Sequence, residues 1–196
     1  MLRNTTKRHS RPDNCREESP DRMKNYLYED GLTTERLCTR FLAPDDIKAW
    51  SKFFEDRDAI EFIPSHGLNS SEERAKFWIE RQVKRYEHKR FGLQALIHIQ
   101  TREFIGQCGL LLQEVDGKKE LEVGYYIFKK YWGQGYATEA AQRFKTYAFK
   151  NKLADSVISI IDTGNVRSQK VAEKNGMSRG VQTKWQNIDA FIYRTK

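Results

Sequence analysis

The segment 131–140, with the sequence YWGQGYATEA, holds residue types that can bind a phosphate group. Two glycines, Gly133 and Gly135, separate a β-like run from a helix-like run. Glycine lets backbone N–H groups approach an anion closely, and the positive end of the helix dipole attracts the same anion. The same spacing also fits an ordinary glycine turn between a strand and a helix. The segment is therefore a candidate pyrophosphate cradle that other residues must support.

Two other phosphate-binding motifs do not fit this segment. A P-loop requires Lys followed by Ser or Thr after its last glycine, where this chain has Tyr136 and Ala137. A dinucleotide-binding fingerprint requires a third glycine where Thr138 stands, and it belongs to a βαβ unit. The residues therefore disfavour the binding of a nucleoside triphosphate or of a dinucleotide.

The residues before the cradle predict one strand, two helices and a three-strand meander. Apolar residues at helical spacing follow Pro44, and Ser70 with Glu73 forms a capping-box signature at the start of the second helix. Short turn-like connections join the next three β-like runs, so we expect these runs to pair antiparallel. The predicted strands cover residues 34–42, 91–100, 103–115 and 120–130.

The residues after the cradle complete a mixed sheet. We expect a helix from about residue 137, a strand over 155–162, a helix over 166–176, and closing strands in 177–185 and 190–195. The helix from residue 137 connects strand 120–130 to strand 155–162, which makes these two strands parallel neighbours. The order predicts an α+β fold with a mixed, mostly antiparallel sheet, not a doubly wound one.

The composition predicts one domain behind a polar tail. The 196 residues include 38% hydrophobic side chains, enough for one core. Residues 1–28 are polar and unpatterned, so we predict a disordered tail there and a single domain over 29–196. No apolar stretch approaches the roughly 20 residues of a membrane helix, and the start of the chain lacks a secretory pattern. We therefore expect a cytoplasmic protein without membrane association.

The net charge of +8 arises in the last third of the chain. Residues 1–128 hold 22 basic and 22 acidic side chains, whereas residues 129–196 hold 13 basic and 5 acidic ones. Such a region attracts a polyanion, which charge alone does not identify as nucleic acid, acidic protein or phosphorylated cofactor. No basic and aromatic interleaving resembles an RNA-binding module, which disfavours nucleic acid except through an association with ribosomes. Histidine and cysteine spacing predicts no metal site.

The stretch ELEVGYYIFKKYWGQGYATEAAQRFKTYAF, residues 120–149, resembles the acyl-CoA-binding motif of the GNAT superfamily and specifically its RimJ/RimL-like branch. The resemblance extends from Thr34–Leu37 to Asn165–Ser168 and Glu173–Met177. It implies the GNAT fold, whose central sheet has a splayed parallel strand pair and helices on both faces. It also implies an acetyl-CoA-dependent N-acetyltransferase, an acyltransferase of the EC 2.3.1 class.

The same resemblance implies which residues bind acetyl-CoA. In the family the pantetheine arm pairs with backbone of the strand before the cradle, and pyrophosphate meets backbone N–H groups of the loop. One departure is Trp132, which stands where the superfamily pattern begins with Gln or Arg. The implied cofactor-binding residues are Tyr126, Ile127, Trp132, Gly133, Gln134, Gly135, Tyr136, Ala137, Thr138, Asn165 and Ser168.

The implied reaction is direct attack of a neutral amine on the thioester in a ternary complex. An ammonium must first lose a proton, and Glu122 is the candidate general base because relatives often carry a catalytic glutamate on this strand. The alternative is that Glu122 forms a structural ion pair with a Lys or Arg. Many superfamily members protonate the thiolate with a tyrosine, and Ala172 stands at that position here.

The acceptor is less defined than the cofactor. Relatives in this branch acetylate protein N-termini, polyamines or small amines, and Phe62, His66 and Trp78 are candidates to line the acceptor pocket. The absent tyrosine keeps open a non-catalytic acyl-CoA-binding sensor, and the basic last third keeps open a ribosome- or nucleic-acid-associated module. The sequence is compatible with a monomer or a homodimer.

Overall fold

The computed structural model describes residues 28–195, so the tail predicted over residues 1–28 lies outside the described part except for Tyr28. Tyr28 is buried in the core, and its hydroxyl donates a hydrogen bond to the Gly92 carbonyl oxygen. Its ring packs edge-on against Phe91, with ring centroids 5.2 Å apart. The folded part of the chain therefore includes this residue.

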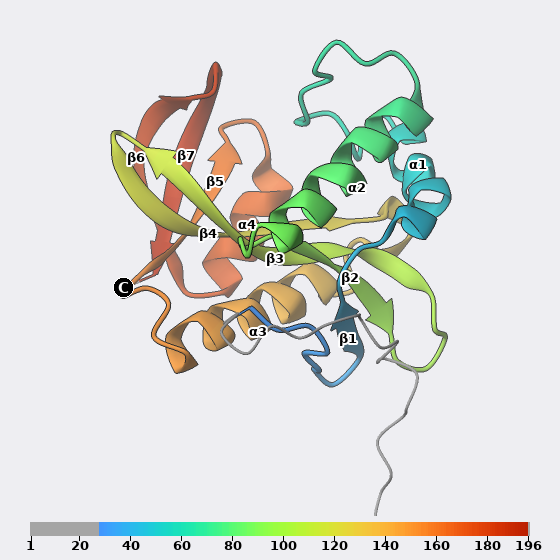
Figure 1. The fold of residues 1–196 in the computed structure, drawn as a ribbon. Helices are drawn as coiled ribbons and strands as arrows, with labels where there is room; N and C mark the ends of the chain where they lie inside the picture. Colours follow the sequence, from blue (N-terminus) through green and yellow to red (C-terminus); the bar gives the residue numbers. More distant parts are fainter. Residues whose placement is uncertain (1–27, 196) are drawn as a thin grey trace, which may run out of the picture.

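Seven strands form one sheet in the order β1-β2-β3-β4-β5-β7-β6, with a parallel pair at β4 and β5 and antiparallel pairs elsewhere. This arrangement confirms the predicted α+β fold and its meander (Figure 1). The strands are β1 (Leu37–Arg40), β2 (Leu93–His98), β3 (Phe104–Val115), β4 (Lys118–Ile127), β5 (Val157–Asp162), β6 (Met177–Trp185) and β7 (Ile188–Thr195). The helices are η2 (Pro44–Asp46), α1 (Ile47–Glu55), α2 (Ser71–Glu87), η3 (Lys129–Tyr131), α3 (Tyr136–Lys150) and α4 (Val166–Lys174).

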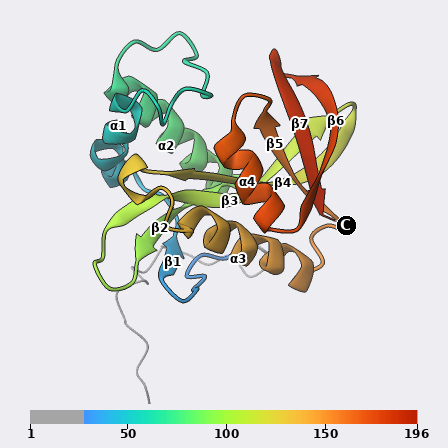
Figure 2. The ribbon, with the colours of Figure 1, turned by 180° about the vertical axis from the view of Figure 1, so that it is seen from behind.

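The helices cover both faces of the sheet, as the resemblance implied. Apolar residues of α1 and α2 pack with Leu93, Ala95 and Leu111 on one face. Those of α3 and α4 pack with Cys108, Leu110 and their neighbours on the other face. Figure 2 shows α3 and the α1–α2 pair on opposite sides of the strands.

The predicted capping box forms at the start of α2. Ser70 Oγ accepts a hydrogen bond from the Glu73 N–H, and the Glu73 carboxylate accepts one from the Ser70 N–H, both at 3.1 Å. These bonds satisfy backbone donors that the first turn of a helix leaves unpaired. They fix the start of the helix whose side chains form one wall of the pocket described below.

The parallel pair β4–β5 separates soon after it forms. The two strands pair only at Leu121 with Val157 and at Glu122 with Ile158, although both continue for several residues. Beyond these pairs side chains bridge the strands: Ser159 Oγ donates to the Val123 carbonyl oxygen at 2.9 Å. The expected splay is therefore present, and it opens directly after Glu122.

Candidate active site

The cradle has the backbone geometry that an anion site requires. Gly133 and Gly135 have φ angles of +75° and +86°, which side-chain-bearing residues rarely adopt. Gly135 is the N-cap of α3 and supplies no side-chain cap. Since the first N–H groups of a helix have no acceptor within it, those of Tyr136, Ala137 and Thr138 can bind an anion. The segment therefore fits a pyrophosphate.

Hydrogen bonds and a cation–π contact of Arg36 support the cradle. The Arg36 guanidinium donates to the Gln134 carbonyl oxygen at 3.0 Å and lies 4.2 Å from the centre of the Tyr136 ring. Glu139, in the first turn of α3, accepts from Arg36 Nε at 2.7 Å and from the Arg36 N–H at 2.9 Å. Thr34 Oγ1 donates to the same carboxylate. These contacts tie the start of α3 to the segment that leads into β1.

Trp132 connects the loop to β4 and to α4. Its indole Nε1 donates to the Ile127 carbonyl oxygen at 2.7 Å, which joins the loop to the end of β4. The Arg167 guanidinium lies 4.5 Å from the centre of a Trp132 ring. The tryptophan thus replaces the charged side chain of the superfamily pattern while placing another cation, from α4, beside the cradle.

Asn165 and Ser168 lie at the start of α4. Asn165 Oδ1 accepts from the Ser168 N–H at 3.0 Å and so caps the helix. The Tyr125 hydroxyl donates to the Ser168 carbonyl oxygen at 2.8 Å, which fixes this turn against β4. Both predicted residues therefore position the helix end that borders the pocket, whatever they contact in a ligand.

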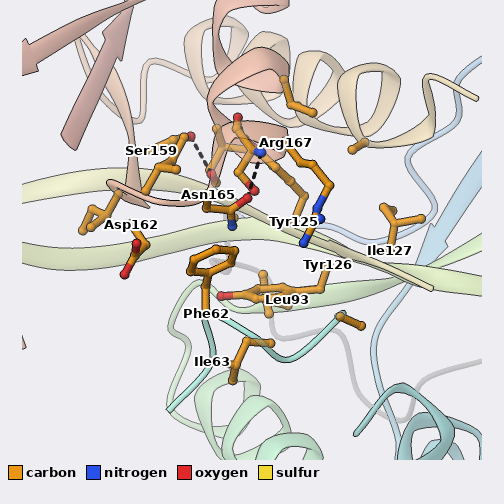
Figure 3. A pocket seen from close by; sticks show the side chains of 18 of the residues that line it. Phe62, Ile63, Leu93, Tyr125, Tyr126, Ile127, Ser159, Asp162, Asn165 and Arg167 are labelled. Carbon is orange, nitrogen blue, oxygen red and sulfur yellow. Dashed lines mark hydrogen bonds between the residues drawn. The ribbon is translucent and has the colours of Figure 1, made fainter. Parts of the chain in front are cut away.

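One pocket of about 470 Å³ brings the cradle, the splay and the α2 wall together. Figure 3 shows side chains from β4, β5, α4 and the loop before α2 around it, including Phe62, Tyr126 and Asn165. Of the predicted site residues, the pocket is lined by Glu122, Tyr126, Ile127, Trp132, Gly133, Gly135, Tyr136, Ala137, Thr138, Asn165 and Ser168. Gln134 does not line it; its carbonyl faces Arg36, and its Nε2 donates to the Lys130 carbonyl oxygen at 3.2 Å.

Glu122 is buried beside the splay without an ion-pair partner among residues 28–195. Its carboxylate accepts hydrogen bonds from Gln113 Nε2 at 2.6 Å and from the Ile160 N–H at 3.3 Å. Burial raises the pKa of Glu122 above its usual value, and the bonds from Gln113 and Ile160 and the charge of Arg85 oppose this rise. The geometry disfavours the structural ion pair and leaves a carboxylate able to hold a proton.

The part of the pocket formed by α2 and the loop before it contains two residues that the sequence patterns did not indicate. Phe62, His66 and Trp78 line it as expected. Arg81 and Arg85 of α2 line it as well. Both follow Trp78 at helical spacing, three and seven residues on, and this periodicity is the signal that could have identified them.

Basic residues on α4 also line the pocket. Arg167, Lys170 and Lys174 belong to the basic last third of the chain, and all three border the same cavity as the cradle. Part of the excess positive charge therefore lies beside a candidate polyanion site.

Cys108 is fully buried in the core, and burial raises the pKa of its thiol far above the usual range. It packs with the apolar residues under α3, as a small core side chain does.

Within residues 28–195 no three or more His, Cys, Asp or Glu side chains are grouped as a metal site requires. None of the helices in the described part of the chain combines the length and the apolar character needed to cross a bilayer.

Comparisons with known proteins agree with this geometry. A family model described as an acetyltransferase (GNAT) domain matches residues 36–178. YkkB, an uncharacterised protein of Bacillus subtilis, is 30% identical over 168 residues, which cover 84% of this chain and 95% of YkkB. A crystal structure of a GNAT-family acetyltransferase from Bacillus anthracis shares 26% identity with a TM-score of 0.67, covering 83% of this chain and 95% of that one.

A further structure shows the same fold at lower identity. It is RimL, a ribosomal L7/L12 α-N-protein acetyltransferase in complex with coenzyme A, with a TM-score of 0.69 and 15% identity. The match covers 85% of this chain and 97% of that one. The likeness extends over nearly the whole described part of the chain.

Proposed function

This chain belongs to the GNAT acetyltransferase family, and we propose that it is an N-acetyltransferase that uses acetyl-CoA to acetylate an amine. The observation that carries the proposal is the single pocket in which the anion cradle, the strand splay and the buried Glu122 meet. The family match and the structure from Bacillus anthracis support the acyltransferase class. The identity of the amine and the roles of individual residues are part of the proposal.

The residues present fit acetyl-CoA, which supplies a thioester as the acyl donor. N–H groups at the start of α3 would hold its pyrophosphate, with the helix dipole behind them. Arg167, Lys170 and Lys174 border the same cavity and would add positive charge. Beyond Glu122 the strand β4 is no longer paired with β5, and past the Val123 carbonyl, which accepts from Ser159 Oγ, an extended arm could form hydrogen bonds with the strand backbone.

Glu122 would accept the proton of the attacking amine. Its carboxylate is fixed by Gln113 and by the Ile160 N–H, so it is oriented before an acceptor arrives. Burial raises its pKa, which brings the carboxylate closer to the proton affinity that a general base needs near neutral pH. The amine would then attack directly, because no nucleophilic side chain of the protein is required.

The position of the family's frequent tyrosine acid offers no proton donor in this chain. Ala172 belongs to α4, does not line the pocket and is fully buried in the core. A protein that only binds acyl-CoA would share this feature, and catalytic turnover separates the two possibilities.

The test is a titration with acetyl-CoA followed by a screen of amines. We expect binding, a rise of the thermal midpoint by mass action, and acceptor-dependent release of free thiol. Absence of binding at millimolar acetyl-CoA would contradict the proposal as a whole. Binding without thiol release for peptide N-termini, polyamines and small amines would favour the non-catalytic alternative.

A further inference from the structure

Two arginines on the α2 wall of the pocket have no acidic partner among the described residues. Arg81 and Arg85 lie one helical turn apart on α2, and both line the pocket that also contains Glu122 and Tyr126. In the part of the chain that the structure describes, neither arginine lies within 4.0 Å of a carboxylate oxygen. Arg85 is half-buried and donates one long hydrogen bond, 3.5 Å, to the Phe91 carbonyl oxygen.

This arrangement is electrostatically unfavourable without a ligand. Burial lowers the pKa of Arg85, and the neighbouring charge of Arg81 lowers it further. Glu122 acts on Arg85 in the opposite direction, but its carboxylate already accepts bonds from Gln113 and Ile160. Two like charges held at a pocket wall are stabilised when an anion lies between them.

Two other carboxylates, Asp58 and Asp162, line the pocket. Asp58 pairs with Lys129 at 2.5 Å, and the hydrogen bond from Lys129 lowers the pKa of the Asp58 carboxyl. Asp162 Oδ1 accepts a hydrogen bond from the Gly164 N–H at 2.8 Å. Among the described residues that line the pocket, Asp162 and the proposed base Glu122 are therefore the carboxylates without a basic partner, whereas α2 contributes two arginines that have no carboxylate beside them.

We infer that the acceptor amine carries an anionic group, a carboxylate or a phosphate, which Arg81 and Arg85 bind while the amine faces Glu122. Guanidinium groups bind both anions through paired N–H donors. A polyamine would bring further positive charge to the same wall and would be repelled. The inference rests on the proposed function and narrows its acceptor class from any amine to an acidic one.

The first experiment compares matched acceptors in a thiol-release assay with saturating acetyl-CoA. The pairs are glycine with glycinamide, phosphoethanolamine with ethanolamine, and peptides with Asp or Lys as the second residue; putrescine and spermidine complete the set. Rates are compared per concentration of neutral amine, because the acidic group changes the pKa of the amine. We expect kcat/KM to be about tenfold or more higher for the acidic member of a pair. The pair with the largest ratio distinguishes carboxylate, phosphate and peptide as the source of the anion.

The second experiment changes the arginines. Arg81→Ala and Arg85→Ala should each lower kcat/KM for the preferred acidic acceptor about tenfold or more, with coenzyme A affinity unchanged. The double variant R81E/R85E should reverse the preference towards putrescine. Lys84→Ala is the matched control, because it removes an exposed basic residue of the same helix that does not line the pocket.

Direct binding separates this inference from the proposed function. Protein saturated with coenzyme A is titrated calorimetrically with N-acetylglycine and with N-acetylglycinamide, and the acidic product should bind more tightly to wild type than to R81A or R85A. Equal rates for both members of every pair would overturn the inference and leave the acetyltransferase proposal standing. No thiol release with any acceptor would contradict the proposed function, and equal binding of the two products would then contradict the inference as well.

Discussion

Arg36 and Glu139, 103 residues apart in the sequence, form an ion pair of 2.6 Å that joins the segment before β1 to the first turn of α3. The pair lies directly beneath the cradle, because Arg36 also donates to the Gln134 carbonyl oxygen. Burial acts to raise the pKa of Glu139, but hydrogen bonds from Thr34 and Arg36 outweigh it, and the pKa falls below its usual value. The carboxylate is therefore charged at neutral pH and fixes the helix start.

Glu139→Gln should weaken both stability and coenzyme A binding. The substitution removes the charge that accepts from Thr34, the Arg36 backbone and the Arg36 side chain. Because the pair is partly exposed, we expect a loss of about 1–2 kcal/mol, or roughly 2–8 °C in the thermal midpoint of a domain this size. Since the folded-state pKa of Glu139 is lowered, its contribution is present above the usual pKa of a glutamate and is lost as the pH falls below it.

Thermal unfolding between pH 3 and pH 7, with and without coenzyme A, measures this effect. Glu80→Gln is the control, because Glu80 forms an exposed pair with Lys76 at 4.0 Å and lies outside the pocket. A variant E139Q with the midpoint and coenzyme A affinity of wild type would show that the pair does not support the cradle.

Gly135→Asp should abolish coenzyme A binding. A Cβ at this position would lie 3.4 Å from Arg36 Nη2, and the added carboxylate would bring negative charge into the loop that is proposed to hold pyrophosphate, where like charges repel. The φ angle of +86° adds strain of roughly 1–3 kcal/mol for a residue with a side chain. Gly117→Asp is a matched control, because Gly117 has a φ angle of +74° in the β3–β4 turn and does not line the pocket. Calorimetric titration of both variants decides: similar affinities would mean that the cradle has been misplaced.

Trp132→Phe separates the indole hydrogen bond from the ring. Phenylalanine keeps an aromatic face for Arg167 but cannot donate to the Ile127 carbonyl oxygen. Leaving that acceptor unpaired costs about 1 kcal/mol in a partly buried site, so we expect a lower thermal midpoint and faster coenzyme A dissociation. Stopped-flow displacement measures the dissociation rate. An unchanged rate with a lower midpoint would restrict the tryptophan to a structural role.

Local patterns predicted the order of strands and helices because each pattern repeats within a few residues. The capping box at Ser70 and the apolar face of α1 are examples, and both occur in the structure. The strand expected over 34–42 covers Leu37–Arg40. It begins only at Leu37 because the backbone N–H of Arg36 bonds to the Glu139 carboxylate and not to β2. A contact between residues so distant in sequence leaves no local pattern.

Some parts of the site could be predicted from short motifs, and others depend on contacts between distant residues. The cradle and the α4 cap depend on short motifs, and the structure brings them together at one pocket. The partner of Glu122 depends on strand register: Leu111 lies opposite Glu122, so Gln113 reaches it diagonally across the β3–β4 pair. Arg81 and Arg85 were missed because a polar helix face reads as solvent-facing until the fold places it against a cavity.

Glu122→Gln tests the proposed base. The amide keeps the size of the side chain, and a rotated Gln113 amide can offer its oxygen while the Ile160 N–H still finds an acceptor. We expect coenzyme A affinity close to that of wild type and turnover lower by roughly a hundredfold or more. The pH profile of kcat/KM should lose the acidic limb that Glu122 sets in wild type above the usual pKa of a glutamate.

The variant E122Q should change the stability of the protein in the opposite direction from a variant that breaks an ion pair. Because the folded-state pKa of Glu122 is raised, its contribution to stability is present below the usual pKa of a glutamate and is lost as the pH rises through the folded-state value. At neutral pH the variant E122Q should therefore melt at or above the wild-type temperature, and the difference should vanish at acidic pH. A lower midpoint with normal turnover at neutral pH would show that Glu122 is not the base.

Glu120→Gln, on the same strand, should affect stability and turnover in the reverse way from Glu122→Gln. Glu120 pairs with Arg194 at 2.7 Å, does not line the pocket, and has its pKa lowered by the hydrogen bond from Arg194. Removing its charge should lower the thermal midpoint at neutral pH and leave turnover near that of wild type. Measured side by side, the two variants separate a carboxylate that stabilises the sheet from one that accepts a proton. Equal effects of both on turnover would mean that strand β4 is distorted by either change, and the assignment of Glu122 would fail.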